Sequence, residues 1–315
     1  LSAASSLRAR GAFRSRGRAL AAGGADLVSA AVPGADRALA LLRDAAAENG
    51  GRSNVFESEA PPWGVVHFVG GAALGTYPAV CYGALLARLA EDGLAVVATP
   101  FDLTLDHESA AKACAAEFEA ASRKYPSELP RFAVGHSLGA KLLLPGAAES
   151  ARYARLALVA AGVRFLSGRR GFSSQVAPNN AGIADSGRLL ERFLDGFGDG
   201  ASRVATAATG VDLGSLIGNI AAMAGLEVSP PPAVTEEIIR DVEAPVTFLR
   251  FDEDELDSSA SLAAALGSPK AVEWLEGTHL TPVLVSVGEF RLGDEAAIGA
   301  VAAAISSALA ILLWH

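Results

Sequence analysis

A serine between two glycines has the clearest chemical potential in this sequence. Residues 135–139 read Gly-His-Ser-Leu-Gly, after an apolar run at 131–134 and before a helix-forming stretch at 140–148. A strand, a G-x-S-x-G turn and a helix in this order make a turn so tight that bulky flanking side chains do not fit. The turn would lift the Ser137 hydroxyl above a sheet edge, and the helix N-terminus would favour negative charge beside it. We therefore expect Ser137 to act as a nucleophile.

A serine hydroxyl is a weak nucleophile until a base removes its proton, and histidine is the usual base. His279 lies in a loop, Glu-Gly-Thr-His-Leu-Thr-Pro at 276–282, directly after the last predicted strand. The chain order expected with this turn is serine, acid, histidine, and His279 alone is placed for it. The other four histidines are placed differently. His67 falls in a strand pattern, and His107 stands at a helix start. His136 lies inside the turn with its side chain directed away from the nucleophile, and His315 is the last residue.

The acid that would orient this imidazole is expected in the loop after the strand at 246–251. Residues 252–257 contain five acidic side chains, so the sequence leaves a choice. In many chains of this type the aspartate stands three positions after a glycine that ends the strand. With Phe251 in the place of that glycine, the spacing gives Asp254, while Asp252 and Asp257 remain alternatives.

Acyl transfer also needs donors for a developing oxyanion. The backbone N–H of Leu138, directly after the nucleophile, is the first expected donor. The second is expected from the loop Val-Gly-Gly-Ala-Ala-Leu-Gly at 69–75, through the N–H of Gly71 or Ala72. This loop contains neither G-x-G-x-x-G nor a P-loop lysine, so it does not indicate nucleotide binding.

Short apolar runs alternate with helix-length segments from residue 61 onward, which is typical of β-α units and a parallel sheet. Such runs are apolar throughout because helices cover both sheet faces. Strands are expected at 65–69, 94–98, 132–135, 156–160, 246–251 and 271–275, and helices at 77–91, 108–123, 138–149, 258–265 and 295–313. With the turn around Ser137, this order predicts an α/β-hydrolase fold with a mostly parallel central sheet and helices on both faces.

An insertion of different character interrupts this order at 163–240. It is rich first in Gly, Ser and Arg and then in Pro and Ala, and three prolines at 230–232 look like a stiff return to the sheet. In this fold an insertion at this place usually covers the site. We therefore expect a lid-like insertion within a domain that spans 61–315.

The two ends of the chain also have distinct compositions. Residues 1–60 are expected to form an N-terminal extension, in which the first 20 contain five arginines, four serines and no acid, as in a plastid or mitochondrial transit segment. Residues 34–48 predict a short helix within it. Residues 296–315 contain no Lys, Arg, Asp or Glu and could span a bilayer. Because alanine dominates this stretch, we expect a helix packed in the core, with membrane contact as the alternative.

Charge and composition exclude other classes of partner. The formal net charge is −9, which argues against nucleic acid because a binding face would need clustered Lys and Arg. Cys81 and Cys114 have neither metal-site spacing nor a disulfide pattern, so no metal or cofactor is predicted. The expected partner is a small acyl or lipid substrate.

Several of these stretches together resemble a particular family. It is the α/β-hydrolase-like group of cyanobacteria and plastids labelled domain of unknown function 1350. The resemblance implies the hydrolase fold and a plastid location, either soluble or peripheral to the thylakoid, and it implies no particular substrate. The matching stretches are Val-His-Phe-Val-Gly-Gly-Ala at 66–72, Val-Val-Ala-Thr-Pro-Phe at 96–101, Leu-Asp-His at 105–107, Gly-His-Ser-Leu-Gly-Ala-Lys at 135–141, Arg-Phe-Asp-Glu-Asp-Glu-Leu-Asp at 250–257 and Gly-Thr-His-Leu-Thr-Pro at 277–282.

Two functions from different classes remain open at this point. The first is a serine hydrolase that acts on an ester, a thioester or a lipid acyl group through Ser137, His279 and Asp254. The second is a protein that kept the fold without the chemistry and serves as a binding or assembly subunit of a thylakoid photosynthetic complex. A fold alone does not decide between them.

Overall fold

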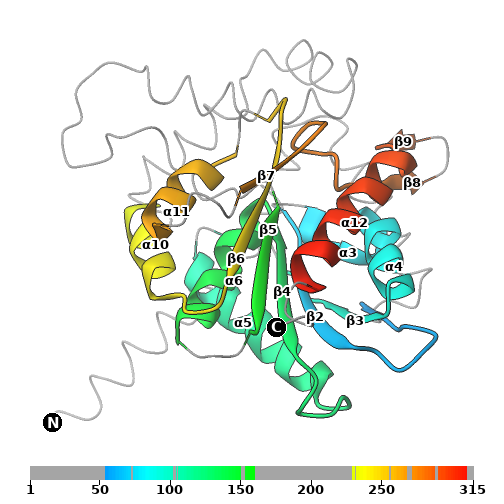
Figure 1. Cartoon of the computed structure of the whole chain (residues 1–315), viewed down its shortest axis with the longest axis horizontal. Coiled ribbons are helices and arrows are strands. Elements are labelled where there is room, and N and C mark those ends of the chain that lie inside the picture. Colours follow the sequence, from blue (N-terminus) through cyan, green and yellow to red (C-terminus); the bar gives the residue numbers. More distant parts are fainter. Residues whose placement is uncertain are drawn as a thin grey trace, which may run out of the picture.

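A seven-stranded sheet forms the centre of the described part of the chain, with the strand order β1-β3-β2-β4-β5-β6-β7 (Figure 1). The structure is a computed structural model that describes residues 54–71, 74–101, 104, 106–149, 153–159, 229–230, 232–254, 257–267, 272–287 and 290–310. Six of the strands run parallel, and β1 pairs antiparallel with β3. The strands are β1 (Val55–Phe56), β2 (Gly64–Val69), β3 (Leu94–Ala98), β4 (Arg131–His136), β5 (Arg155–Val159), β6 (Val246–Phe251) and β7 (Val272–Leu275).

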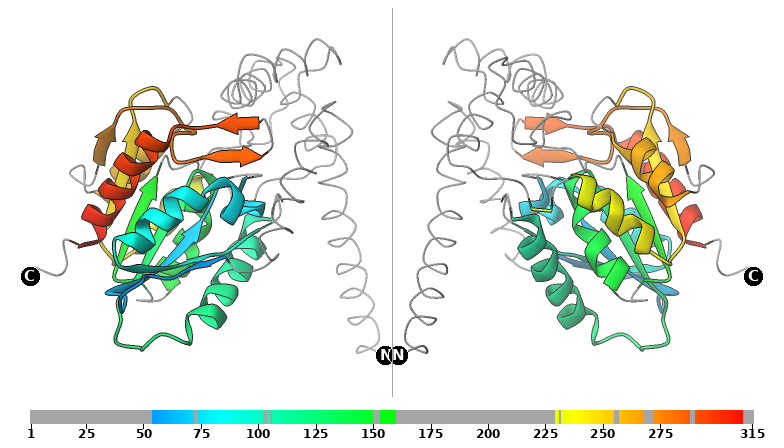
Figure 2. Two further views of the ribbon diagram at one scale, coloured as in Figure 1. Left: turned by 90° about the vertical axis from the view of Figure 1, so that its right-hand side faces the viewer. Right: turned by 90° about the vertical axis from the view of Figure 1, so that its left-hand side faces the viewer.

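Helices cover both faces of this sheet, as the apolar strands predict. One layer contains α5 (His107–Ser122), α6 (Leu138–Glu149), α10 (Pro232–Ile238), which leads into a short 3-10 helix, η2 (Ile239–Asp241), and α11 (Ser259–Leu266). The other contains α3 (Pro78–Cys81), α4 (Gly83–Glu91) and α12 (Glu295–Ala310), so the sheet lies between two helical layers (Figure 1). A 3-10 turn, η1 (Leu74–Thr76), precedes α3, and a hairpin of β8 (Val285–Val287) and β9 (Phe290–Leu292) lies outside the main sheet (Figure 2). The α/β-hydrolase fold predicted from the sequence is confirmed.

One predicted helix is wrong in its continuity. The sequence predicts a single helix over 77–91, whereas the structure breaks it at Tyr82, which has φ −122° and ψ 6°. Tyr82 is fully buried, and its ring lies 5.0 Å from that of Phe68, centroid to centroid. Its hydroxyl contacts two polar groups of the sheet edge, Gly71 and His136. The helix is interrupted where this buried side chain makes its polar contacts.

The remaining predicted elements agree with the structure within one or two residues where they are described. β1, the β8–β9 hairpin and α10 have no counterpart in the predicted elements. The predicted helix at 34–48 lies outside the described residues, as does most of the N-terminal extension. Of the lid-like insertion predicted at 163–240, the structure describes residues 229, 230 and 232–240, and the remainder lies outside the described residues.

A buried lysine ties α5, α6 and the entry to α10 together. Lys141 donates from Nζ to His107 Nδ1 at 3.0 Å and to the Pro230 carbonyl at 2.6 Å. Burial lowers the pKa of Lys141 to about 8, and burial followed by the Lys141 charge lowers the pKa of His107 to about 4. His107 is therefore a neutral acceptor at neutral pH. Next to it, Asp106 caps α5 by accepting from the Ser109 N–H at 3.0 Å. The Asp-His pair at 106–107 thus anchors the elements beside α6.

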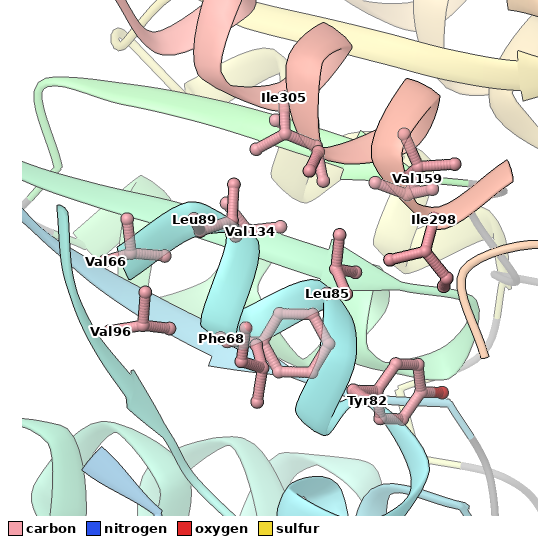
Figure 3. Packing of buried hydrophobic residues seen from close by; sticks show 14 of the residues in the cluster. Val66, Phe68, Tyr82, Leu85, Leu89, Val96, Val134, Val159, Ile298 and Ile305 are labelled. Carbon is pink, nitrogen blue, oxygen red and sulfur yellow. The ribbon is translucent and has the colours of Figure 1, made fainter. Parts of the chain in front are cut away.

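The apolar C-terminal stretch packs as a core helix over its described length. Ile298, Ile305 and Leu309 of α12 are fully buried and belong to the cluster between the sheet and α4. Within the part of the chain described here, no helix combines the length and apolarity that a bilayer crossing requires. The residues labelled in Figure 3 are Val66, Phe68, Val96, Val134 and Val159 of the sheet, Tyr82, Leu85 and Leu89 near or in α4, and Ile298 and Ile305 of α12.

We expect truncation of the α12 face to destabilise the whole domain. Ile305→Ala removes a fully buried side chain from the cluster and should lower the free energy of unfolding by about 2–4 kcal/mol. The control is Ser307→Ala on the exposed face of the same helix, which should change it by less than about 0.5 kcal/mol. Urea denaturation of both variants measures the difference. Equal stability of the two variants would contradict the packing of α12 on the sheet.

Candidate active site

Ser137 has a backbone conformation that other side chains avoid. Its φ is 53°, the one positive φ of a non-glycine residue in the described part of the chain. Its N–H still donates to the Val159 carbonyl at 3.0 Å, so the residue continues the β4–β5 ladder. α6 begins at the next residue, Leu138. The chain therefore turns from strand to helix at Ser137 itself, in the strained arrangement of a nucleophile elbow.

The two glycines that flank the turn allow the backbones to approach. A Cβ added to Gly139 would lie 2.0 Å from the Val69 carbonyl oxygen and 2.5 Å from that of Gly70. A Cβ on Gly135 would lie 2.6 Å from Ala140 Cα. The first turn of α6 therefore sits directly on the carboxyl end of β2, which no other residue at position 139 would permit without a shift.

Three side chains from separate loops meet at this turn. His279 Nε2 lies 2.8 Å from Ser137 Oγ, and His279 Nδ1 lies 2.8 Å from Asp254 Oδ2. The Asp254 carboxylate is an acceptor, so Nδ1–H donates to it and Nε2 is left to accept the Ser137 hydroxyl proton. Ser137 is 4% exposed and His279 is 7% exposed. The structure thus brings together the three side chains that the sequence singled out, in the order serine, imidazole, carboxylate.

The three aspartates left open by the sequence have different partners in the structure. Asp254 contacts His279. Asp252 is exposed and accepts from the Gly277 N–H at 2.8 Å. Asp257 accepts from Arg250 Nε and from the Ser259 N–H, the latter at 3.0 Å. Geometry therefore selects Asp254 as the carboxylate beside the imidazole, and the other two hold the backbone of neighbouring segments.

Backbone hydrogen bonds join the loop that carries Asp254 (the acid loop) to the loop that carries His279 (the base loop). The Asp252 N–H donates to the Leu275 carbonyl at 3.1 Å, and the Glu253 N–H donates to the Gly277 carbonyl at 3.0 Å. These bonds extend the parallel pairing of β6 and β7 beyond the ends of both strands. The loop that carries Asp254 and the loop that carries His279 therefore approach the elbow as one unit.

The three backbone N–H groups predicted as oxyanion donors have different surroundings in the structure. Leu138 is the first residue of α6, and the first N–H groups of a helix have no partner within it. The Gly71 N–H donates to the Tyr82 hydroxyl at 2.8 Å, so this N–H is engaged and does not serve as the predicted donor. Ala72, the alternative, lies outside the described residues. Leu138 remains the donor with a described place at the site.

The family of the chain follows from its sequence match. The family described as "Protein of unknown function (DUF1350)" matches residues 52–304. The chain belongs to this family. The match includes the elbow, both loops of the site and every described strand. A comparison with curated proteins finds no matching sequence.

Solved structures of several hydrolases are similar to the chain at low identity. A lipase-esterase related protein from Clostridium acetobutylicum is 13% identical, with a TM-score of 0.49 over 81% of this chain and 98% of that one. A monoacylglycerol lipase from Paleococcus ferrophilus is 15% identical, with a TM-score of 0.46 over 80% and 97%. The thioesterase domain from a curacin biosynthetic pathway is 16% identical, with a TM-score of 0.45 over 80% and 92%. At 13–16% identity, these similarities assign no chemistry to the residues of this chain.

Two buried residues at the site do not stand out in the sequence. His136 and Tyr82 are 1% and 0% exposed, and the Tyr82 hydroxyl lies 2.8 Å from His136 Nδ1. His136 Nε2 lies 2.9 Å from the carbonyl oxygen of His279. Burial, and then the proximity of His279, lowers the pKa of His136 to about 3. His136 is therefore neutral at neutral pH.

We expect substitution by alanine to have opposite effects on stability at Gly139 and at Gly299. Gly139→Ala places a methyl group against the carbonyls of β2 and should lower the free energy of unfolding by at least about 2 kcal/mol. Gly299→Ala, within α12 and with nothing within 4 Å of the added Cβ, should raise it by about 0.5–1 kcal/mol through helix propensity. Thermal or urea unfolding of both variants measures this. A tolerated alanine at 139 would contradict the close seat of α6 on β2.

The lowered pKa of His136 predicts acid sensitivity. The unfolded chain takes up a proton at this ring near pH 6.5 and the folded chain only near pH 3, so its contribution to stability is lost as pH falls through this window. From pH 7 to pH 5 the wild type should lose about 2 kcal/mol more than His136→Gln, which cannot titrate. Urea denaturation at the two pH values measures the difference. Parallel losses in both proteins would contradict a buried, neutral His136.

Proposed function

We propose that this chain is a serine hydrolase that cleaves an ester or thioester of a small acyl or lipid substrate. The observation that carries the proposal is the continuous contact from Asp254 through His279 to Ser137, with 2.8 Å at each junction. A base within hydrogen-bond reach of the hydroxyl and a third group that orients the base are the geometric requirements of nucleophilic serine catalysis. The positive φ of Ser137 is the backbone feature that presents such a hydroxyl.

The first half of the reaction would form an acyl-enzyme. Ser137 Oγ attacks the substrate carbonyl carbon while His279 Nε2 takes the hydroxyl proton. Asp254 holds the proton on Nδ1 and stabilises the imidazolium that forms. The tetrahedral intermediate then collapses, the bond from carbon to the leaving oxygen or sulfur breaks, and His279 returns the proton to the departing alcohol or thiol.

The second half would release the acid and restore the serine. A water molecule gives a proton to His279 Nε2 and attacks the acyl carbon. The bond between that carbon and Ser137 Oγ breaks, and Oγ takes the proton back from the imidazolium. The products are a carboxylic acid and the free enzyme, with no other reactant needed.

The surroundings of these groups favour this charge separation. The side chain of Asp254 is fully buried and that of His279 is 8% exposed, so the attraction between carboxylate and imidazolium is screened less than it would be in water. The N-terminus of α6 faces the point where the oxyanion develops, and the Leu138 N–H is the donor expected there.

Reaction with a fluorophosphonate probe tests the proposal. The probe phosphonylates an activated serine, and we expect labelling of the wild type and none of Ser137→Ala. Ser127→Ala, at an exposed serine outside the site, should be labelled like the wild type. In-gel fluorescence and intact mass report the adduct. A wild type that stays unlabelled would contradict the hydrolase and leave the binding or assembly role.

The acid can be tested by a matched pair of variants in one loop. Asp254→Asn removes the carboxylate that orients His279 and should slow labelling on the order of ten-thousandfold. Asp252→Asn keeps an Oδ1 acceptor for the Gly277 N–H and should stay close to the wild-type rate. Equal loss in the two variants would show that loop structure, and not the carboxylate beside the imidazole, sets the rate.

A further inference from the structure

A buried chain of hydrogen bonds runs behind the three proposed catalytic side chains. It starts at the Gly71 N–H, passes through the Tyr82 hydroxyl and the His136 ring, and ends at the carbonyl oxygen of His279. The three contacts measure 2.8, 2.8 and 2.9 Å. None of these contacts is used by the reaction steps above.

The two end groups of this hydrogen-bond chain determine which atom donates and which accepts in each of its bonds. The Gly71 N–H can only donate, so the Tyr82 oxygen accepts there and its own proton is directed to His136 Nδ1. The His279 carbonyl can only accept, so His136 must donate from Nε2. A neutral His136 with its proton on Nε2 satisfies both contacts, whereas a proton on Nδ1 would oppose the Tyr82 hydroxyl.

The hydrogen-bond chain joins three segments that carry the site and are far apart in sequence. Gly71 belongs to the loop after β2, in which the second oxyanion donor is expected. His136 ends β4 and directly precedes Ser137. The third segment is the base loop, which His136 reaches from 143 positions away in the sequence. The rings of His136 and His279 lie 5.1 Å apart, centroid to centroid.

We propose that Tyr82 and His136 are positioning residues for the reaction of Ser137, a role that rests on the proposed function. Asp254 orients the His279 ring, and His136 holds the backbone that carries this ring. Tyr82 holds His136 in the tautomer that can donate to that backbone, and at the same time holds Gly71. Because a displacement of about 1 Å between base and nucleophile can cost about a hundredfold in rate, a bond to the backbone of the base is consequential.

Removal of the Tyr82 hydroxyl tests this role, and a second buried tyrosine of the protein, Tyr153, offers a matched control. Tyr82→Phe keeps the ring that packs on Phe68 and removes both hydrogen bonds of the hydroxyl, to the Gly71 N–H and to His136 Nδ1. Tyr153→Phe removes the hydroxyl of another buried tyrosine–histidine pair, in which Tyr153 Oη lies 2.7 Å from His67 Nδ1 on a different part of the sheet. Both variants lose a buried tyrosine–histidine hydrogen bond, and only Tyr82→Phe breaks the proposed positioning chain.

The readout is the concentration dependence of fluorophosphonate labelling, which separates probe binding from reaction. For Tyr82→Phe we expect the saturating rate constant to fall about tenfold or more, with an unchanged half-saturation concentration. Tyr153→Phe should keep both parameters of the wild type. Equal rate constants in the two variants would overturn the positioning role while the hydrolase stands, whereas an unlabelled wild type would overturn both.

A measurement on the wild type keeps the inference testable if Tyr82→Phe does not fold. Long-range nitrogen–proton spectra of the histidine rings distinguish the two tautomers and the charged form. We expect His136 to carry its proton on Nε2 at both pH 7 and pH 5. A proton on Nδ1, or a ring protonated on both nitrogens at pH 5, would overturn the direction of the chain and with it the role of Tyr82.

Discussion

The close approach of α6 to the carboxyl end of β2 is the constraint on which the site depends. Without a side chain at Gly139, the first turn of the helix lies against the carbonyls of Val69 and Gly70. Because of this close contact, the backbone turns from β4 into α6 at a single residue, Ser137, which has φ 53°. The same contact places the N-terminus of α6, with the Leu138 N–H, beside the loop after β2. The backbone strain at Ser137 and the electrostatics of its surroundings therefore have one structural cause.

Around this turn, the buried side chains of Tyr82, His136 and His279 each have a defined hydrogen-bond partner. An unpaired buried polar group would cost about 1–3 kcal/mol, so directed hydrogen bonds both satisfy these groups and specify their positions. The acid and base loops are held by their backbone bonds, and the two imidazoles that approach each other belong to different networks. His279 faces Ser137 and Asp254, while His136 faces Tyr82 and the His279 backbone. A neutral His136 can lie next to His279 without opposing the positive charge that His279 would acquire as the proposed base.

The sequence predicts the parts of this arrangement that are local, and it misses those that depend on tertiary contacts. The elbow was predictable because strand, glycines, serine and helix are contiguous. The base followed from chain order among few histidines, and the acid was narrowed to three aspartates whose partners only the fold could distinguish. The bonds from Tyr82 to His136 and from His136 to His279 span 54 and 143 positions, and no periodicity signals them. The break of the helix at Tyr82 was not predicted either, although Gly83, directly after it, has low helix propensity.

A crystal structure of the chain after reaction with a fluorophosphonate would show the proposed nucleophile, base and oxyanion donor together. We expect continuous density from Ser137 Oγ to phosphorus, a positive φ at Ser137, and a phosphoryl oxygen within hydrogen-bond distance of the Leu138 N–H. His279 Nε2 should lie within reach of the adduct, with Asp254 on its other nitrogen. A crystal with no adduct at Ser137, or one in which Ser137 has an ordinary negative φ with its hydroxyl turned into the core, would contradict the proposed role of Ser137.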